Sequence, residues 1–203
     1  GTAGLGIPVI DVQAVSRRFG EVQALAGVSL AVGEGEVVGL IGHNGAGKST
    51  LIKLMLGLIA PDAGEIRIAG QPVRGTAFRE VRRRIAYLPE NIVFYDNLSG
   101  LETLEFLADL KGAPRATCGA LLDEVGLGAA ARRGVRGYSK GMRQRLGFAQ
   151  ALLGAPDLLF LDEPTTGLDP RSKLDVQAFV EEVNAEHGAT IVLTTHDLVE
   201  AER

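Results

Sequence analysis

The sequence of 203 residues predicts an α/β fold, with a mostly parallel core sheet that is interrupted by a helical insertion. Short apolar strand patterns alternate with helix patterns near both ends of the chain, and a glycine-rich loop joins one strand to the helix after it. Helical signals dominate between residues 99 and 154. Since no repeat, low-complexity tract or linker divides these parts, we expect one domain over 1–203 with a helical subdomain at about 91–154.

The first ninety residues read as short strands separated by glycine-bearing turns. Their apolar positions predict strands at 9–19, 28–32, 37–41, 65–69 and 85–88. A helix over 49–57 is expected after the strand at 37–41, on the far side of the glycine-rich loop. Strand, loop and helix therefore follow one another in the order that a phosphate-binding loop requires.

A capping-box pattern opens the helical insertion. Ser99 and Glu102 stand at the N-cap and N3 positions of a helix. The apolar positions of this helix predict one buried side, formed by Leu101, Leu104, Phe106, Leu107 and Leu110.

The last third of the chain returns to the strand and helix alternation. Strands are expected at 158–161 and 190–195, the second because its residues are mostly β-branched. Between them, Asp169 and Pro170 suit the N-cap and N1 positions of a helix that reaches about His187.

Residues 42–49 have the form G-x-x-x-x-G-K-S, which in this context predicts a phosphate-binding loop. Glycines let the backbone turn sharply with several N–H groups pointing inward, and the following helix adds its positive end. Lys48 supplies a full charge for the β and γ phosphates of a nucleotide, and Ser49 offers a hydroxyl to Mg²⁺. The expected contacts to nucleotide are Gly42, Asn44, Gly45, Ala46, Gly47, Lys48, Ser49 and Thr50.

Two carboxylates, Asp162 and Glu163, follow the apolar strand at 158–161. If this strand lies beside the strand at 37–41, Asp162 comes near Ser49, where it can hold Mg²⁺ or the water around it. Glu163 then lies where it can orient or deprotonate a water molecule. The alternative, a polar turn after a core strand, is less consistent with the nearby phosphate loop.

Two further features have both a structural and a functional interpretation. A lone histidine such as His196 is usually structural, but at the end of a core strand beside a γ phosphate it can stabilise a transition state. Ser139 suits the N-cap of a helix, and with Gly141 it can form a second anion site. By itself this pattern favours an ordinary capped helix.

Composition excludes several classes of protein. The formal net charge of −4 argues against a general nucleic-acid partner, and we interpret the cluster of Arg79, Arg82, Arg83 and Arg84 as a solvated helix face. Cys118 is a lone cysteine, so no internal disulfide can form, as is typical of a reducing cytoplasm. No apolar run is long enough to span a membrane.

Five motifs, in order, resemble those of the ATP-binding-cassette (ABC) ATPases. These are the Walker A, signature, Walker B, D-loop and H-loop motifs, at 42–49, 138–144, 158–164, 167–169 and His196. The resemblance covers nearly the whole chain. It implies a P-loop fold of ABC type with an antiparallel β subdomain, truncated here at its C-terminal end, that uses ATP and Mg²⁺.

The same resemblance implies partners and further site residues. Family members pair head to tail, with ATP clamped between the Walker A loop of one copy and the signature of the other. Ser139 and Gly141 would then contact the γ phosphate of the partner's nucleotide, and Phe19 would stack on adenine. Lys48, Glu163 and His196 would be catalytic. A transmembrane permease subunit would hold the ATPase at the cytoplasmic face of the membrane.

Two departures from the family pattern are visible. The signature reads Tyr-Ser-Lys-Gly-Met over 138–142, which keeps the serine and the second glycine of the usual Leu-Ser-Gly-Gly-Gln. Glu90 stands where the Q-loop usually has glutamine. A carboxylate there can still reach Mg²⁺ or water, but it adds negative charge near the γ phosphate.

Within the family, the runs at 87–91, 94–95, 98–100 and 138–145 resemble the ATPase subunit of the transporter that supports copper-site maturation of nitrous oxide reductase. The alternatives are the ATPase of another ABC exporter and a non-transport regulatory ATPase of ABC type. A GTPase is disfavoured because no N-K-x-D guanine-reading motif is present, and the signature run disfavours a small-molecule kinase.

Overall fold

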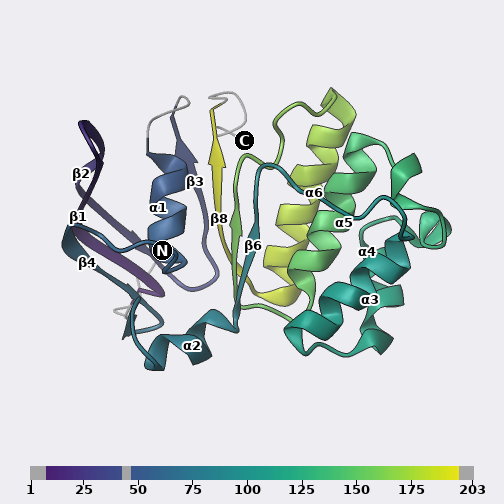
Figure 1. Ribbon diagram of the computed structural model, residues 1–203, viewed down its shortest axis with the longest axis horizontal. Helices are drawn as coiled ribbons and strands as arrows, with labels where there is room; N and C mark the ends of the chain where they lie inside the picture. The colour runs from purple at the N-terminus through teal and green to yellow at the C-terminus, as the bar shows by residue number, and fades with distance from the viewer. Residues whose placement is uncertain (1–7, 43–46, 197–203) are drawn as a thin grey trace.

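The computed structural model describes residues 8–42 and 47–196, which form two four-stranded sheets with helices around them (Figure 1). The antiparallel sheet has the order β2-β1-β4-β5, with β1 at Ile10–Phe19, β2 at Val22–Val32, β4 at Ala63–Ile68 and β5 at Gln71–Pro72. The parallel sheet has the order β3-β8-β7-β6, with β3 at Val37–Ile41, β6 at Ile85–Leu88, β7 at Leu158–Leu161 and β8 at Thr190–Thr195.

The helices cover both faces of the parallel sheet. Within the described residues they are α1 at Lys48–Met55, α2 at Ala77–Arg82, α3 at Gly100–Lys111, α4 at Cys118–Glu124, α5 at Lys140–Leu152 and α6 at Pro170–His187. Helix α1 lies between the two sheets, and α5 and α6 lie on the opposite face of the parallel sheet (Figure 1). Helices α3, α4 and α5 are inserted between β6 and β7. No helix among the described residues is both long and apolar enough to cross a membrane.

Strand β7 is buried on both faces, which explains its unbroken apolar sequence. Leu158 and Phe160 face the core that α1 shares with the antiparallel sheet, whereas Leu159 and Leu161 face the core formed by α5 and α6. In the second core, the rings of Phe148 and Phe179 stack with their centroids 4.0 Å apart. The residues that follow β7 are therefore attached to a strand that is packed from both sides.

Strands β6, β7 and β8 have the bounds that the sequence predicts, but β2 and β4 begin earlier. Strand β2 begins at Val22 instead of residue 28, because the chain turns at Gly20 and Phe19 pairs with Val22 in a hairpin. Many residues of this hairpin are exposed, so their sequence lacks a regular apolar alternation. Strand β4 begins at Ala63, two residues before its apolar pattern becomes visible.

The expected neighbour of β3 was wrong. Strand β8, not β7, pairs with β3, and β8 also pairs in parallel with β7, so that it separates the two. The order of parallel strands depends on contacts between distant segments, which a local pattern does not encode. As a result, Thr194 and Thr195 lie between the loop after β3 and the carboxylates after β7.

The predicted capping box opens α3. The Ser99 hydroxyl accepts a hydrogen bond from the Glu102 N–H at 3.1 Å, and the Glu102 carboxylate accepts one from the Ser99 N–H at 2.8 Å. Asp169 and Ser139 likewise cap α6 and α5, as the sequence predicts.

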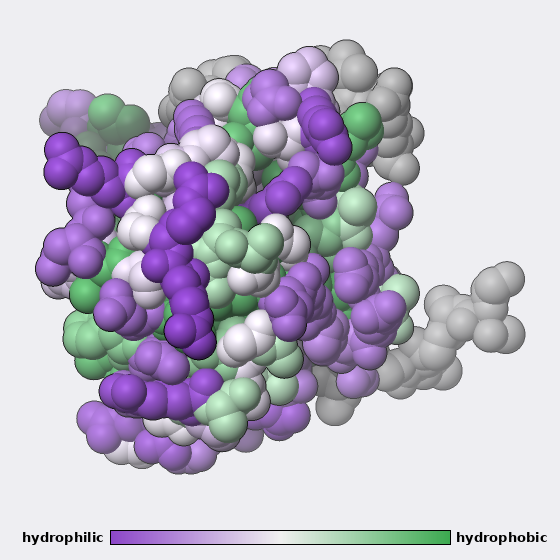
Figure 2. Space-filling view, turned by 90° about the vertical axis from the view of Figure 1, so that its right-hand side faces the viewer, coloured by the Kyte–Doolittle hydropathy of each residue, from purple (hydrophilic) through white to green (hydrophobic). Residues whose placement is uncertain are grey.

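The predicted buried side of α3 is only partly correct. Leu104 is buried, but Phe106 and Leu110 are 43% and 70% exposed. The ring of Phe106 contacts the exposed Tyr95 edge to face, with centroids 6.2 Å apart. Figure 2 shows this side of the molecule, where hydrophilic side chains surround smaller hydrophobic areas.

Replacing Ser99 with alanine should destabilise the helical insertion, because the Ser99 hydroxyl is the acceptor for the Glu102 N–H in the first turn of α3. The expected loss is about 1 kcal/mol of unfolding free energy, measured by urea denaturation. Ser99→Asp keeps an acceptor at the cap and serves as the matched control. Equal stability of Ser99→Ala and Ser99→Asp would contradict a role for the cap.

Candidate functional site

The candidate site lies where β3, β7 and β8 end and α1 begins, because parallel strands present their carboxyl ends at one edge of the sheet. Gly47 is the N-cap of α1 in a left-handed conformation with φ 84°. A Cβ atom at this position would lie 2.4 Å from the Ala24 carbonyl oxygen, so only glycine fits beside β2. Asn44, Gly45 and Ala46 lie outside the described residues, and Thr50 is half-buried in the first turn of α1.

Lys48 is held by acceptors at or just after the carboxyl ends of β3, β7 and β8. Its Nζ atom lies 2.7 Å from Glu163 Oε1 and 3.0 Å from the Thr195 carbonyl oxygen, and it also donates to the Gly42 carbonyl. The side chains of Lys48 and Glu163 are only 9% and 5% exposed. This buried cation therefore lies where the phosphate-binding loop leads into α1.

The structure brings Asp162 next to Ser49, as the sequence predicts. The Ser49 hydroxyl, at the start of α1, lies 3.3 Å from Asp162 Oδ2, although β8 separates β7 from the strand β3 that leads to α1. A hydroxyl beside a carboxylate is a set of hard oxygen donors, and this set fits Mg²⁺. Burial and the hydrogen-bonded charge of Asp162 raise the pKa of the neighbouring Tyr87 to about 12, so Tyr87 stays neutral.

Glu163 lies at the centre of the site, with both carboxylate oxygens bonded. Its Oε1 atom bonds to Lys48. Its Oε2 atom lies 2.9 Å from His196 Nδ1 and accepts a hydrogen bond from the Thr166 hydroxyl at 3.2 Å. Burial raises the pKa of Glu163, but the hydrogen bonds from Lys48 and His196 outweigh burial and lower it overall. The carboxyl group is therefore ionised at neutral pH. His196 itself is about half exposed.

Thr194 also belongs to the site, although its sequence pattern predicts only a strand residue. It is fully buried, and its hydroxyl bonds to both Asp162 and Glu163. The only sequence signal is weak: Thr194 is the next-to-last residue of β8, two positions before His196, where a β-branched residue is also expected for packing. Recognising it requires knowing that β8 lies directly beside β7.

The signature residues lie apart from the residues around Lys48 in the described structure. Ser139 is exposed and caps α5 by accepting a hydrogen bond from the Met142 N–H at 3.1 Å. A Cβ atom on Gly141 would lie 2.8 Å from the Ser172 hydroxyl at the start of α6. Gln144, farther along α5, donates to the Pro164 carbonyl at 2.6 Å, which links this helix to the loop after the two carboxylates.

Phe19 and Glu90 make no hydrogen bond or ion pair with the central residues among the described interactions. Phe19 is 46% exposed at the end of β1, and the guanidinium of Arg17 lies 4.8 Å from its ring centroid. The hairpin that carries Phe19 also supplies Ala24, which contacts Gly47. Glu90 is exposed two residues after β6, close enough for its charge to help raise the pKa of Tyr87.

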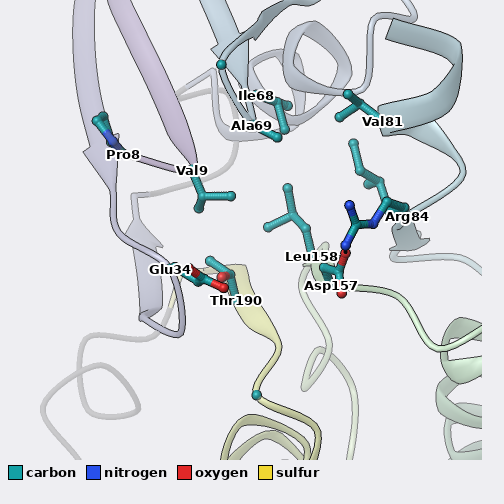
Figure 3. A pocket seen from close by; sticks show the side chains of 13 residues that line it. Pro8, Val9, Glu34, Ile68, Ala69, Val81, Arg84, Asp157, Leu158 and Thr190 are labelled. Atoms are coloured by element: carbon teal, nitrogen blue, oxygen red, sulfur yellow. Dashed lines mark ion pairs between the residues drawn. The ribbon is translucent and has the colours of Figure 1, made fainter. Parts of the chain in front are cut away.

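A separate pocket of about 390 Å³ lies at the opposite end of the parallel strands. It is bounded by residues at the starts of β6, β7 and β8 and by the end of β4, and Figure 3 shows Val9 and Leu158 pointing into it. The ion pair of Arg84 with Asp157 lies at one side (Figure 3). Because the site around Lys48 is at the carboxyl ends of the same strands, this pocket does not belong to it.

The central residues form one chemical unit. A buried lysine and a serine hydroxyl at the start of α1 meet the two carboxylates that follow β7. A lysine and a helix N-terminus attract phosphate, a hydroxyl with a carboxylate suits Mg²⁺, and a second carboxylate can polarise water. This combination suits the binding and transfer of phosphoryl groups.

Comparison with known proteins agrees with this geometry. The ABC transporter family model matches residues 25–166. The daunorubicin resistance ATP-binding protein DrrA3 of Streptomyces coeruleorubidus is 42% identical over 198 residues, covering 96% of this chain and 62% of that protein. The chain spans between half and two thirds of the length of the curated relatives that it matches.

Solved structures share the fold. CbiO1 from Clostridium perfringens, part of the ABC transporter complex CbiONQ, superposes with a TM-score of 0.84 at 28% identity, covering 95% of this chain and 80% of CbiO1. The ATP-binding cassette MJ0796, solved as a dimer in a post-hydrolysis state with ADP and Pi, gives 0.82 at 28% identity and coverage of 95% and 90%. From its fold, its site and these matches, the chain belongs to the ABC transporter family.

Proposed function

We propose that this chain binds ATP with Mg²⁺ and hydrolyses it, as the ATPase subunit of a transporter. The observation that carries this proposal is the convergence of Lys48, Ser49, Asp162 and Glu163 at one edge of the parallel sheet. A nucleotide-binding module without turnover would have no use for the buried, ionised carboxylate of Glu163 beside His196.

In the proposed reaction, Lys48 exchanges its contact with Glu163 for the β and γ phosphates of ATP. Ser49 and Asp162 would hold Mg²⁺, which neutralises phosphate charge when it is bound. Glu163, freed from Lys48, polarises the water molecule that attacks the γ phosphorus. His196 contributes a hydrogen bond to the γ phosphate as its charge develops.

The proposed active form is a head-to-tail dimer of two copies of this chain. Each copy would contribute Ser139 and Gly141 to the nucleotide bound at the other copy's Lys48. The exposed position of Ser139 at the N-terminus of the long helix α5 supports this, since such a terminus attracts phosphate. Phe19 would stack on adenine, and Glu90 would contact Mg²⁺ or water. The dimeric structure of MJ0796 is consistent with this arrangement.

We further propose a transmembrane permease subunit as the partner, which would place the chain at the cytoplasmic face of a membrane, with no nucleic acid involved. Val93, Tyr95 and Phe106 support this partner, because they are 91%, 64% and 43% exposed near the helical insertion. Apolar groups that are exposed together often form a protein interface. The permease would therefore contact the segment from Glu90 to Ser99 and helix α3.

The finer proposal is that the transporter supports copper-site maturation of nitrous oxide reductase. Its support is the resemblance of the runs at 87–91 and 138–145 to that ATPase subunit. The alternative is the ATPase of another exporter, which the 42% identity to a daunorubicin resistance protein favours.

Gene neighbours and a deletion strain separate these two proposals. For copper maturation, genes for a multi-spanning membrane protein and a periplasmic copper-handling protein should adjoin the gene of this chain. Deleting that gene should then lower the copper content of nitrous oxide reductase, measured by metal analysis of the purified enzyme, and leave daunorubicin resistance unchanged. The reverse result, sensitivity to the drug with a fully copper-loaded reductase, would establish the exporter instead.

Replacing Glu163 with glutamine should abolish turnover without loss of ATP binding, because the carboxylate is proposed to act on water and not on the nucleotide. Phosphate release should fall about 10²- to 10⁴-fold. Light scattering with Mg-ATP should detect an accumulated dimer of the variant. Lys48→Ala should instead lose nucleotide binding, and Glu182→Gln, at an exposed position on α6, is the charge-matched control. Native turnover by Glu163→Gln would remove Glu163 from the mechanism.

Stability should depend on pH through Glu163. Because its pKa in the folded chain is below the ordinary value of 4.5, the carboxylate stabilises the fold above that pH and the contribution is lost as the pH falls through the folded pKa. The melting temperature of the wild type should therefore exceed that of Glu163→Gln at pH 7, and the difference should vanish in acid. A difference that is the same at both pH values would contradict the lowered pKa.

A further inference from the structure

We propose that Thr194 is a positioning residue, whose single hydroxyl aligns Asp162 and Glu163 together for ATP hydrolysis. This inference rests on the proposed function. It adds a residue on β8 to the groups that hold the two carboxylates in place. The hydrogen bonds of the Thr194 hydroxyl support it.

Both bonds of the Thr194 hydroxyl lead to the carboxylate pair. The hydroxyl donates to Asp162 Oδ1 at 2.8 Å and accepts from the Glu163 N–H at 2.8 Å. Thr194 is 0% exposed, and both carboxylate residues are 6% exposed, so water does not compete with these bonds. One oxygen atom therefore fixes a side chain and the backbone of the next residue.

The bond to Asp162 Oδ1 determines where the other oxygen of that carboxylate points. With Oδ1 bonded to Thr194, Oδ2 faces the Ser49 hydroxyl at a distance of 3.3 Å. These are the two side chains proposed to hold Mg²⁺. Without the Thr194 hydroxyl, Oδ1 loses its bond, and among the described residues only the Tyr87 and Ser49 hydroxyls restrain the terminal torsion of Asp162, which is broad in carboxylates. Thr194 thus orients the metal ligand without touching the metal.

The bond to the Glu163 N–H supports an unusual backbone. Glu163 has φ 46°, in the left-handed region that costs free energy for a residue with a side chain. Such a conformation persists only when its surroundings hold it. The Glu163 backbone N–H is held by Thr194, while its side chain is held by Lys48, Thr166 and His196. When Lys48 turns to phosphate, the Thr194 bond to the backbone remains.

The strand pairing makes Thr194 a rigid support. Thr194 pairs with Leu40 of β3, and the preceding Leu193 pairs with Leu161 of β7, immediately before the carboxylates. Backbone pairing with both neighbouring strands therefore holds the part of β8 that carries the hydroxyl. Because Thr194 acts through Asp162 and Glu163, its loss should change the reaction rate and the Mg²⁺ dependence more than it changes the affinity for the nucleotide.

The test compares Thr194→Val with Thr190→Val, a matched control on the same strand. Thr190 is also buried, at 1% exposure, and its hydroxyl accepts from the Gly35 N–H at 2.9 Å, but it lies at the other end of β8. Both valine variants lose a buried hydroxyl of the same size. Thr194→Ser keeps the hydroxyl, and Thr194→Ala removes it with less bulk should the valine variant fail to fold.

Three quantities are measured on each purified variant: the melting temperature, kcat and KM for ATP, and the Mg²⁺ concentration that half-saturates binding of a fluorescent ATP analogue. Thr194→Val should lower kcat about 10- to 100-fold with a small change in KM. It should also raise the half-saturating Mg²⁺ concentration by a similar factor. Thr194→Ser should restore both values, and Thr190→Val should lower only the melting temperature.

Equal kcat and Mg²⁺ dependence in Thr194→Val and Thr190→Val would overturn the inference and leave Thr194 a structural residue. Failure of the proposed function gives a different result, because the wild type would then release no phosphate from Mg-ATP. Even in that case the Mg²⁺ dependence of analogue binding tests Thr194, since this measurement requires no turnover.

Discussion

The ion pair between Lys48 and Glu163 is the interaction on which the site depends. Taking both charges out of water is costly, and their attraction offsets this cost only when the remaining hydrogen-bonding positions are also filled. Here Lys48 also donates hydrogen bonds to the Gly42 and Thr195 carbonyls, and Glu163 is also bonded to His196. One network thus joins Gly42 after β3, Thr195 at the end of β8 and Glu163, the second residue after β7. In this network the Glu163 carboxylate neutralises the Lys48 charge that phosphate would meet.

Much of the fold is predictable because its signals are local. Helices α3, α5 and α6 are capped by Ser99, Ser139 and Asp169, whose side chains accept a hydrogen bond from the first turn. Strands β6 to β8 are short apolar runs. Two other features have no such local signal. The β1–β2 hairpin is largely exposed and so lacks a regular apolar pattern. The central position of β8 depends on contacts between segments more than a hundred residues apart.

The candidate site was predictable to the extent that its residues belong to recognisable patterns. The residues that follow a strand or open a helix are brought together in the structure. They are Lys48, Ser49, Asp162, Glu163 and His196. Thr194 has no pattern of its own, since a threonine in a β-branched strand is expected for packing alone. For Phe106 the pattern predicts burial, but the residue is exposed. An apolar residue at a helical spacing need not face the core when it packs on an exposed neighbour, here Tyr95.

The central position of β8 has a mechanical consequence. Backbone hydrogen bonds along both of its edges connect it to β3 and to β7, so a pull on the chain after Thr195 is shared between the two neighbouring strands. The hydrogen bonds pass such a load to the end of β3, which precedes the phosphate-binding loop, and to the end of β7, which precedes Asp162 and Glu163. Displacement of β8 would therefore disturb both halves of the site through separate strands.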